Sequence, residues 1–206
     1  DGDGQAPART RENDRSATAI DGRVSEVGPG PLADSLTYSV VLQRGQQQDI
    51  PLQIVLSLDD TGPFVNVTLD CPAGNDTPIQ AFNYPAALYP PSPEDYFLGV
   101  ADYTDGRYLP VGDTYCRNRV FCSTGGDMPF VLVTDGTRGM VTIMLTPWDA
   151  GIQMQTRVGD PENLGFPGFR WFPRKGAWGQ SRRGRLAFFP QGGHVAACKI
   201  YRDVAL

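Results

Sequence analysis

The chain has 206 residues, enough for one large or two small domains with a core that needs neither metal nor dense cross-linking. Its 24 Gly and 18 Pro residues exclude a helical bundle, and no apolar run approaches the roughly 18–20 residues of a membrane-spanning helix. The net charge of −5 argues against nucleic-acid binding, because contacts with phosphates need a basic surface.

The first fifteen residues, DGDGQAPARTRENDR, contain no large apolar side chain. We therefore expect residues 1–15 to form a flexible arm and residues 16–206 to form a single β-rich domain. The chain begins at Asp1 without a Met or an apolar leader, which is typical of a processed form such as a mature secreted protein or a polyprotein product.

Apolar and polar residues alternate in short runs between turn-forming residues, which predicts β-strands along most of the chain. The predicted strands cover residues 16–20, 23–27, 36–42, 52–58, 65–69, 130–133, 141–145, 152–154, 169–172, 186–189 and 195–201. Only residues 92–95 (SPED) are typical of a helix start, and they support one or two turns. The pattern predicts an all-β fold: an antiparallel β-sandwich or jelly roll, with a closed barrel as the alternative and at most one or two short helices.

Asp-Gly dipeptides between predicted strands indicate tight hairpins, because this pair tolerates the positive φ that both central positions of a two-residue turn require. Three are found, at Asp21-Gly22, Asp105-Gly106 and Asp135-Gly136. Residues 81–93 (AFNYPAALYPPSP) contain four prolines and are incompatible with a central strand. We expect this segment to form a long surface loop of the kind that carries function on a rigid β scaffold.

Aromatic residues gather along this loop and the strands that follow, at Tyr84, Tyr89, Tyr96, Tyr103 and Tyr108. Tyrosine contacts ligands at a low entropic cost, so Tyr89 and Tyr96 are candidate ligand-binding residues. The alternative is that these rings pack within the loop and cover one end of a sheet.

A second candidate site lies in residues 165–185, GFPGFRWFPRKGAWGQSRRGR, where aromatic and basic side chains are mixed. Its candidate ligand-binding residues are Phe169, Arg170, Trp171, Arg174 and Trp178. Strand alternation directs Phe169 and Trp171 to one face, and Arg170 and Phe172 to the other. Exposed aromatic rings stack on sugars, and Arg donates to hydroxyls, carboxylates or sulfates. The alternative is that the rings belong to the core of a β-sandwich.

Four cysteines predict two disulfides in an oxidising compartment, with Cys116–Cys122 and Cys71–Cys198 as the preferred pairs and free buried thiols as the alternative. Asn66 and Asn75 lie in N-glycosylation sequons, which suit a secreted or viral surface protein. The absence of C-x-x-C pairs and the single histidine disfavour a zinc site, and no motif indicates another metal or a cofactor.

Catalysis has weaker support in the sequence than binding. His194 is the only histidine and no Gly-x-Ser-x-Gly elbow is present, so His194 is more readily an ordinary residue at the start of a strand. An enzyme would instead need a converging trio such as Tyr201, Arg185 and His194, or a pair of carboxylates. The candidate carboxylates are Asp59, Asp60, Glu94, Asp95, Asp102, Asp105, Asp160 and Glu162, all in contexts typical of turns.

These observations predict a non-catalytic recognition domain that is secreted or exposed on a cell or virion surface. Its partner is a glycan or a protein surface, and it has neither a nucleic-acid partner nor a membrane span; homo-oligomers are compatible with the sequence. A viral surface or capsid domain fits the same features. The alternative function is a secreted polysaccharide hydrolase or lyase on a jelly-roll scaffold.

Overall fold

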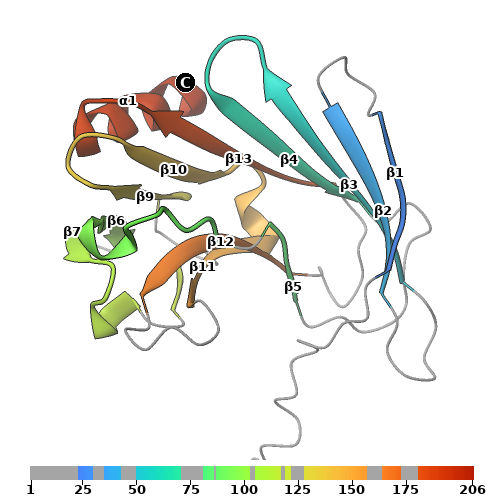
Figure 1. Ribbon diagram of the computed structural model, residues 1–206, viewed down its shortest axis with the longest axis horizontal. Helices are drawn as coiled ribbons and strands as arrows, with labels where there is room; N and C mark the ends of the chain where they lie inside the picture. Colours follow the sequence, from blue (N-terminus) through green and yellow to red (C-terminus); the bar gives the residue numbers. More distant parts are fainter. Residues whose placement is uncertain are drawn as a thin grey trace, which may run out of the picture.

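The computed structural model describes residues 23–29, 35–42, 50–70, 81–85, 87–102, 105–116, 119–121, 128–156, 164–172 and 181–206. These residues form two antiparallel sheets and one α-helix (Figure 1), which confirms the predicted all-β antiparallel sandwich. The described strands of each sheet follow a linear order with two open edges, so they do not form the closed barrel. The arm at residues 1–15 and the Asp21-Gly22 turn lie outside the described residues.

The larger sheet has nine strands, each antiparallel to its neighbours. In spatial order they are β1 (Arg23–Pro29), β2 (Ser35–Leu42), β3 (Ile50–Asp59), β4 (Phe64–Asp70), β13 (Arg182–Phe189), β10 (Gly139–Met144), β9 (Phe130–Thr134), β6 (Phe97–Asp102) and β7 (Asp105–Pro110). Strand β13 lies between β4 and β10, so the C-terminal part of the chain completes the centre of the sheet.

The smaller sheet has four strands in the order β5 (Phe82–Asn83), β12 (Gly165–Trp171), β11 (Ala150–Thr156) and β8 (Val120–Phe121). Its strand β12 packs against β9 and β10 of the larger sheet. Short 3₁₀ helices lie in the connections: η2 (Pro93–Asp95), η3 (Thr114–Cys116) and η4 (Pro147–Asp149), the last joining β10 to β11. The helix start predicted at residues 92–95 is therefore confirmed as the single turn η2.

Alternating side chains fill the space between the sheets. Phe169 and Trp171 of β12 are fully buried, while Arg170 between them is only partly buried, as strand alternation predicts. On the facing strand β13, an added Cβ at Gly184 would lie 2.5 Å from the ring of Phe169. The core is therefore so close-packed at this point that only glycine fits opposite the ring.

The C-terminal segment differs from the prediction, since residues 195–201 are not a strand but part of helix α1 (Gly193–Ala205). The helix lies on the face of the larger sheet opposite the smaller sheet (Figure 1), in contact with β9, β10 and β13. Its inward side chains recur at helical spacing and comprise Ala196, Ala197, Ile200, Tyr201 and Val204. The apolar residues Val195, Ala197 and Tyr201 also fit an alternating pattern, which is why the segment resembles a strand in the sequence.

Two predicted Asp-Gly turns differ in register from the structure. The amide of Asp135 donates to the carbonyl of Arg138 at 3.1 Å, so the central residues of this turn are Gly136 and Thr137. Gly136 has φ of 93°, whereas Asp135 precedes the turn and accepts hydrogen bonds from its amides. The other dipeptide, Asp105-Gly106, belongs to β7, because β6 ends at Asp102, which pairs with Asp105.

Candidate functional site

A groove of about 710 Å³ opens between the proline-rich segment 87–91 and the strands at the centre of the larger sheet. We call it the aromatic groove. Its lining residues are Pro63, Leu88, Tyr89, Pro90, Pro91, Tyr96, Val133, Arg138, Gly139, Met140, Phe166, Phe188, Phe189 and Pro190. Part of the segment predicted to be a surface loop therefore forms one wall of this groove, and both candidate tyrosines, Tyr89 in that segment and Tyr96 after it, lie in the lining.

The tyrosine rings are held against the core. Tyr89 packs on the buried ring of Phe166 with 5.1 Å between centroids, and its hydroxyl donates to the carbonyl of Gln155 at 2.8 Å. The rings of Tyr96 and Phe166 pack edge to face, with 6.3 Å between their centroids. The Gln155 side chain accepts from the amide of Ala87 at 3.2 Å, which ties the proline-rich segment to β11. This wall is therefore in place before any ligand arrives.

Each wall of the groove carries an apolar side chain that is exposed to solvent. Phe188, at the end of β13, is 37% exposed, and Leu88 across the groove is 46% exposed. The amide of Phe188 donates to the carbonyl of Pro63 at 3.1 Å, which fixes the backbone at this point. Exposed apolar side chains on a fixed backbone form a surface suited to binding.

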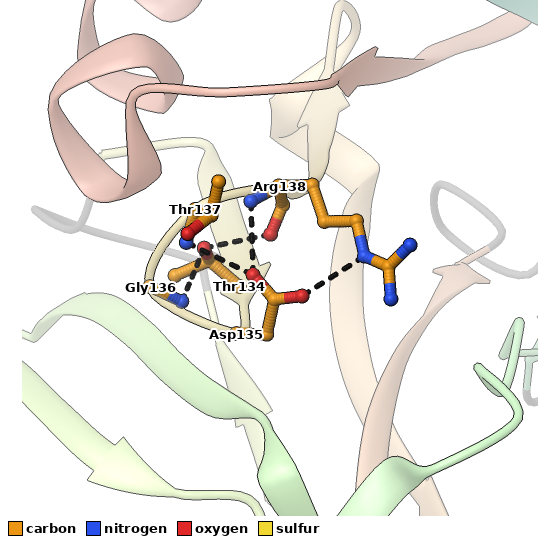
Figure 2. A network of polar contacts seen from close by, with 5 residues as sticks. All are labelled: Thr134, Asp135, Gly136, Thr137 and Arg138. Carbon is orange, nitrogen blue, oxygen red and sulfur yellow. Dashed lines mark hydrogen bonds and ion pairs between the residues drawn. The ribbon is translucent and has the colours of Figure 1, made fainter.

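The rim of the groove carries Arg138, which a hydrogen-bonded turn holds in place (Figure 2). Asp135 Oδ1 accepts from the amides of Thr137 and Arg138, each at 2.9 Å, and its Oδ2 accepts from Arg138 Nε at 2.9 Å. The Thr134 hydroxyl donates to the carbonyl of Arg138 at 2.8 Å and accepts from the amide of Gly136 at 3.0 Å. The backbone and the guanidinium of Arg138 are therefore both anchored by the turn.

The hydrogen bonds of the turn shift the pKa values of both Asp135 and Arg138 toward their charged forms. The backbone N–H of Thr137 is the main cause that lowers the pKa of Asp135, with partial burial opposing it and Arg138 adding to it. The Asp135 hydrogen bond and then the Tyr96 side chain raise the pKa of Arg138. Arg138 is the charged member of the lining, and none of the described Asp or Glu residues is part of it.

The second predicted site is largely core. Trp171 and Phe169 are fully buried, and Trp171 Nε1 donates to the carbonyl of Tyr84 at 2.6 Å, so neither ring is available to a ligand and the core alternative holds. Arg170 lies outside the groove lining, where its Nη1 donates to Gln153 Oε1 at 2.6 Å. Arg174 and Trp178 lie outside the described residues.

The predicted disulfide between Cys71 and Cys198 is not formed, because Cys198 is an exposed, free cysteine on α1. Cys71 and Cys122 lie outside the described residues, as does the side chain of Cys116. The predicted pair fails because residues 193–205 form a helix on the outer face of the sheet, and this helix exposes the thiol of Cys198 to solvent.

The sequon residue Asn66 lies on β4, between β3 and β13. Its Oδ1 accepts from Arg185 Nε at 2.7 Å, and its Nδ2 donates to Asp59 Oδ2 at 3.4 Å. A glycan would be attached to this Nδ2, and glycosylation of Asn66 stays a prediction. The other sequon residue, Asn75, lies outside the described part of the chain.

The groups considered for catalysis are dispersed. His194 is exposed at the start of α1, whereas Tyr201 stacks on Phe130 about two helical turns away, with 4.2 Å between centroids. Arg185 instead pairs with Asp59 at 3.0 Å. Within the described ranges, no three metal-ligating side chains are grouped.

The remaining candidate carboxylates have turn or edge positions. Thr61 donates to Asp59, and this contact is the main cause that lowers the pKa of Asp59. The others lie in the turn after β3 (Asp60), in η2 (Glu94 and Asp95) or where β6 pairs with β7 (Asp102 and Asp105), while Asp160 and Glu162 fall outside the described residues.

Sequence reasoning missed three exposed residues. Nothing in the sequence distinguishes Arg138 from other turn residues or Phe188 from other strand residues, because the groove joins segments that are far apart along the chain. The third is Trp148, which is 86% exposed on η4. The only sequence signal for its exposure is the preceding Pro147, which is typical of a turn, and Trp148 lies outside the groove lining.

No protein-family model and no curated protein matches the sequence. Solved structures do match, among them the α-N-acetylgalactosaminidase NagBb from Bifidobacterium bifidum in complex with GalNAc, with a TM-score of 0.67 and 18% identity. The same enzyme matches in complex with Gal-NHAc-DNJ (TM-score 0.65, 18% identity) and ligand-free (TM-score 0.62, 16% identity). Each match covers 87% of this chain and 30% of the enzyme.

At these identities the likeness shows the fold: a β-sandwich that occurs as one part of a longer glycosidase chain. This chain spans about 30% of the length of that enzyme. In the described part of the chain, no helix has the length and apolar character needed to cross a membrane.

Proposed function

We propose that this chain is a non-catalytic β-sandwich domain that binds a glycan in the aromatic groove. The observation that carries the proposal is the pairing of Tyr89 and Tyr96, which are fixed against Phe166 at one wall of a groove of about 710 Å³. Aromatic and proline surfaces stack on the C–H faces of sugars, while the rim residue Arg138 supplies donors for their oxygens. A groove of this volume accommodates a small ligand or one to a few sugar units.

Binding is favoured over catalysis by the composition of the groove. Glycoside hydrolysis uses two carboxyl groups about 5–10 Å apart on either side of the scissile bond. The groove lining contains none of the described Asp or Glu residues, and the carboxylate of Asp135, which pairs with the lining residue Arg138, accepts hydrogen bonds from the turn. The domain would then bring a glycan to another part of a longer protein.

The structural neighbours support a carbohydrate-related role. The fold of this chain matches 30% of the length of an α-N-acetylgalactosaminidase. An accessory sandwich in a secreted carbohydrate-active protein is consistent with this partial match. A protein ligand would use the same exposed side chains of Leu88 and Phe188, and it is an outcome that the following experiment distinguishes.

The test is binding of a panel of neutral, uronic and sulfated oligosaccharides by isothermal titration calorimetry, with Phe188→Ala as the groove variant. Phe97→Ala is a matched control, because Phe97 is 38% exposed on β6 and stacks on Tyr108 outside the groove lining, against 37% exposure for Phe188. We expect at least one glycan to bind, and Phe188→Ala to weaken it by about 5–30-fold, corresponding to about 1–2 kcal/mol.

The control variant should bind as the parent chain does. Absence of binding across the panel, or equal losses in Phe188→Ala and Phe97→Ala, would contradict the proposal. Thermal unfolding of each variant establishes that a loss of binding is not a loss of fold.

A further inference from the structure

The charge of the aromatic groove differs in sign from that of the whole chain. The chain has a net charge of −5, yet the charged side chain that lines the groove is the cation Arg138. The rest of the lining is apolar apart from its two tyrosines. Because the Arg138 side chain is largely exposed and already paired with Asp135, its attraction for an anionic group depends on direct hydrogen bonds and is weakened by salt.

The geometry of Arg138 leaves the far edge of its guanidinium directed away from the turn. Its Nε donates to Asp135 Oδ2 at 2.9 Å, and Figure 2 shows the two terminal nitrogens pointing away from Asp135. These nitrogens belong to the same rim as Tyr96, whose side chain interacts with Arg138. The side chain of Arg138 is 69% exposed, so a ligand in the groove has access to it.

Asp135 orients this cation by accepting from Nε, so the carboxylate does not occupy the two terminal nitrogens. The carboxylate is held by the amides of Thr137 and Arg138, and the carbonyl of Thr137 accepts from the amide of Gly193 at 2.7 Å. The turn is therefore attached to the start of α1 as well as to β9 and β10. A guanidinium fixed at Nε loses less conformational freedom when its terminal nitrogens bind a ligand.

From this arrangement we infer that the groove selects glycans that carry an oxyanion, a carboxylate or a sulfate, and that Arg138 binds this group while Asp135 positions Arg138. The inference rests on the proposed glycan-binding function. The planar fork of a guanidinium matches both oxyanions with two parallel hydrogen bonds, and the pyranose ring would stack on the aromatic wall. A neutral sugar would keep the stacking but lose the charge-assisted pair.

The experiment compares three oligosaccharides of equal length, one neutral, one composed of uronates and one O-sulfated, by calorimetry at low and high salt. The variants are Arg138→Gln, Arg138→Lys and Asp135→Asn. Arg202→Gln is the matched control, because Arg202 is also exposed (62%) and paired with a neighbouring aspartate, Asp203, but lies outside the groove lining.

We expect an anionic oligosaccharide to bind at least about 10-fold more tightly than the neutral one at low salt, with a smaller preference at high salt. Arg138→Gln should reduce the affinity for the anionic oligosaccharide to that for the neutral one. Arg138→Lys should give an intermediate affinity, because it keeps the charge and loses the fork. Asp135→Asn should weaken the anionic ligand alone, and Arg202→Gln should change nothing. Comparison of the uronate and the sulfated ligand identifies which oxyanion is preferred.

Two contrary results are distinguishable. Equal affinity for the neutral and anionic ligands, unchanged in Arg138→Gln, would overturn the inference and leave the glycan-binding function intact. If no oligosaccharide of the three binds, the proposed function fails as well.

Discussion

The contact between Gly184 and Phe169 provides a direct test of the sandwich core. A Cβ at Gly184 would lie 2.5 and 2.6 Å from two atoms of the Phe169 ring, closer than real Cβ contacts allow. The ring has no room to withdraw, because it is fully buried and stacks on Trp171 with 5.1 Å between centroids. Gly184→Ala therefore forces either the ring or strand β13 to move.

The expected cost follows from overpacking of a close-packed core, about 1–3 kcal/mol of unfolding free energy. For a domain of this size, this corresponds to a fall in Tm of roughly 2–12 °C. Chemical denaturation and differential scanning calorimetry would measure both quantities. Gly106→Ala on β7 is the control, because an added Cβ there meets nothing within 4 Å. It should leave stability unchanged or raise it by up to about 1 kcal/mol.

A second variant identifies the ring as the cause. If the clash is with Phe169, adding Phe169→Leu to Gly184→Ala should cost less than the sum of the two single changes. Full stability of Gly184→Ala, or additive costs in the double variant, would refute the packing of β13 against β12.

Three further predictions concern the turn, the sequon and the thiol. Because the pKa of Asp135 is lowered by folding, its contribution to stability is present above its unfolded pKa of about 3.9 and is lost as the pH falls through its folded pKa. Asp135→Asn should therefore flatten the dependence of the unfolding free energy on pH in this range, and an unchanged dependence would contradict this. Asn66→Ala removes the acceptor of Arg185 Nε, while Asp59 still accepts from Nη2, and should lower the unfolding free energy by about 1–2 kcal/mol in urea titrations; a stability equal to that of the parent would contradict this. Cys198 should react with iodoacetamide without denaturant, as detected by mass spectrometry, and protection of this thiol in the native protein would contradict its exposed position on α1.

Strand patterning predicted many of the individual strands and the all-β fold class, because its period of two is local. The alternation at 52–58 and 65–69 corresponds to β3 and β4, and the directions of Phe169 and Arg170 within β12 are as predicted. The same local reasoning failed at α1, where small and apolar residues satisfy both periods. The helix is decided by burial of one side against β9, β10 and β13, which is a tertiary effect.

The candidate site could be predicted only in part. The proline-rich segment marks one wall, because its prolines exclude a central strand, and Tyr89 lies within it, half-buried against Phe166. Phe188 and Arg138 depend on strand order, in particular on β13 lying beside β10, which no local pattern encodes. Whether an aromatic residue such as Trp171 belongs to the core or to a site is likewise decided by which sheet it faces.

The position of a bound glycan tests glycan binding in the groove most directly. Titration of the isotope-labelled chain with the best oligosaccharide of the panel, followed by amide chemical shifts, would locate it. Glycan binding in the groove predicts that the largest shifts occur at Leu88, Arg138 and Phe188, with Tyr108 and Arg202 unaffected. Large shifts confined to residues outside the groove lining, with these three unmoved, would contradict it.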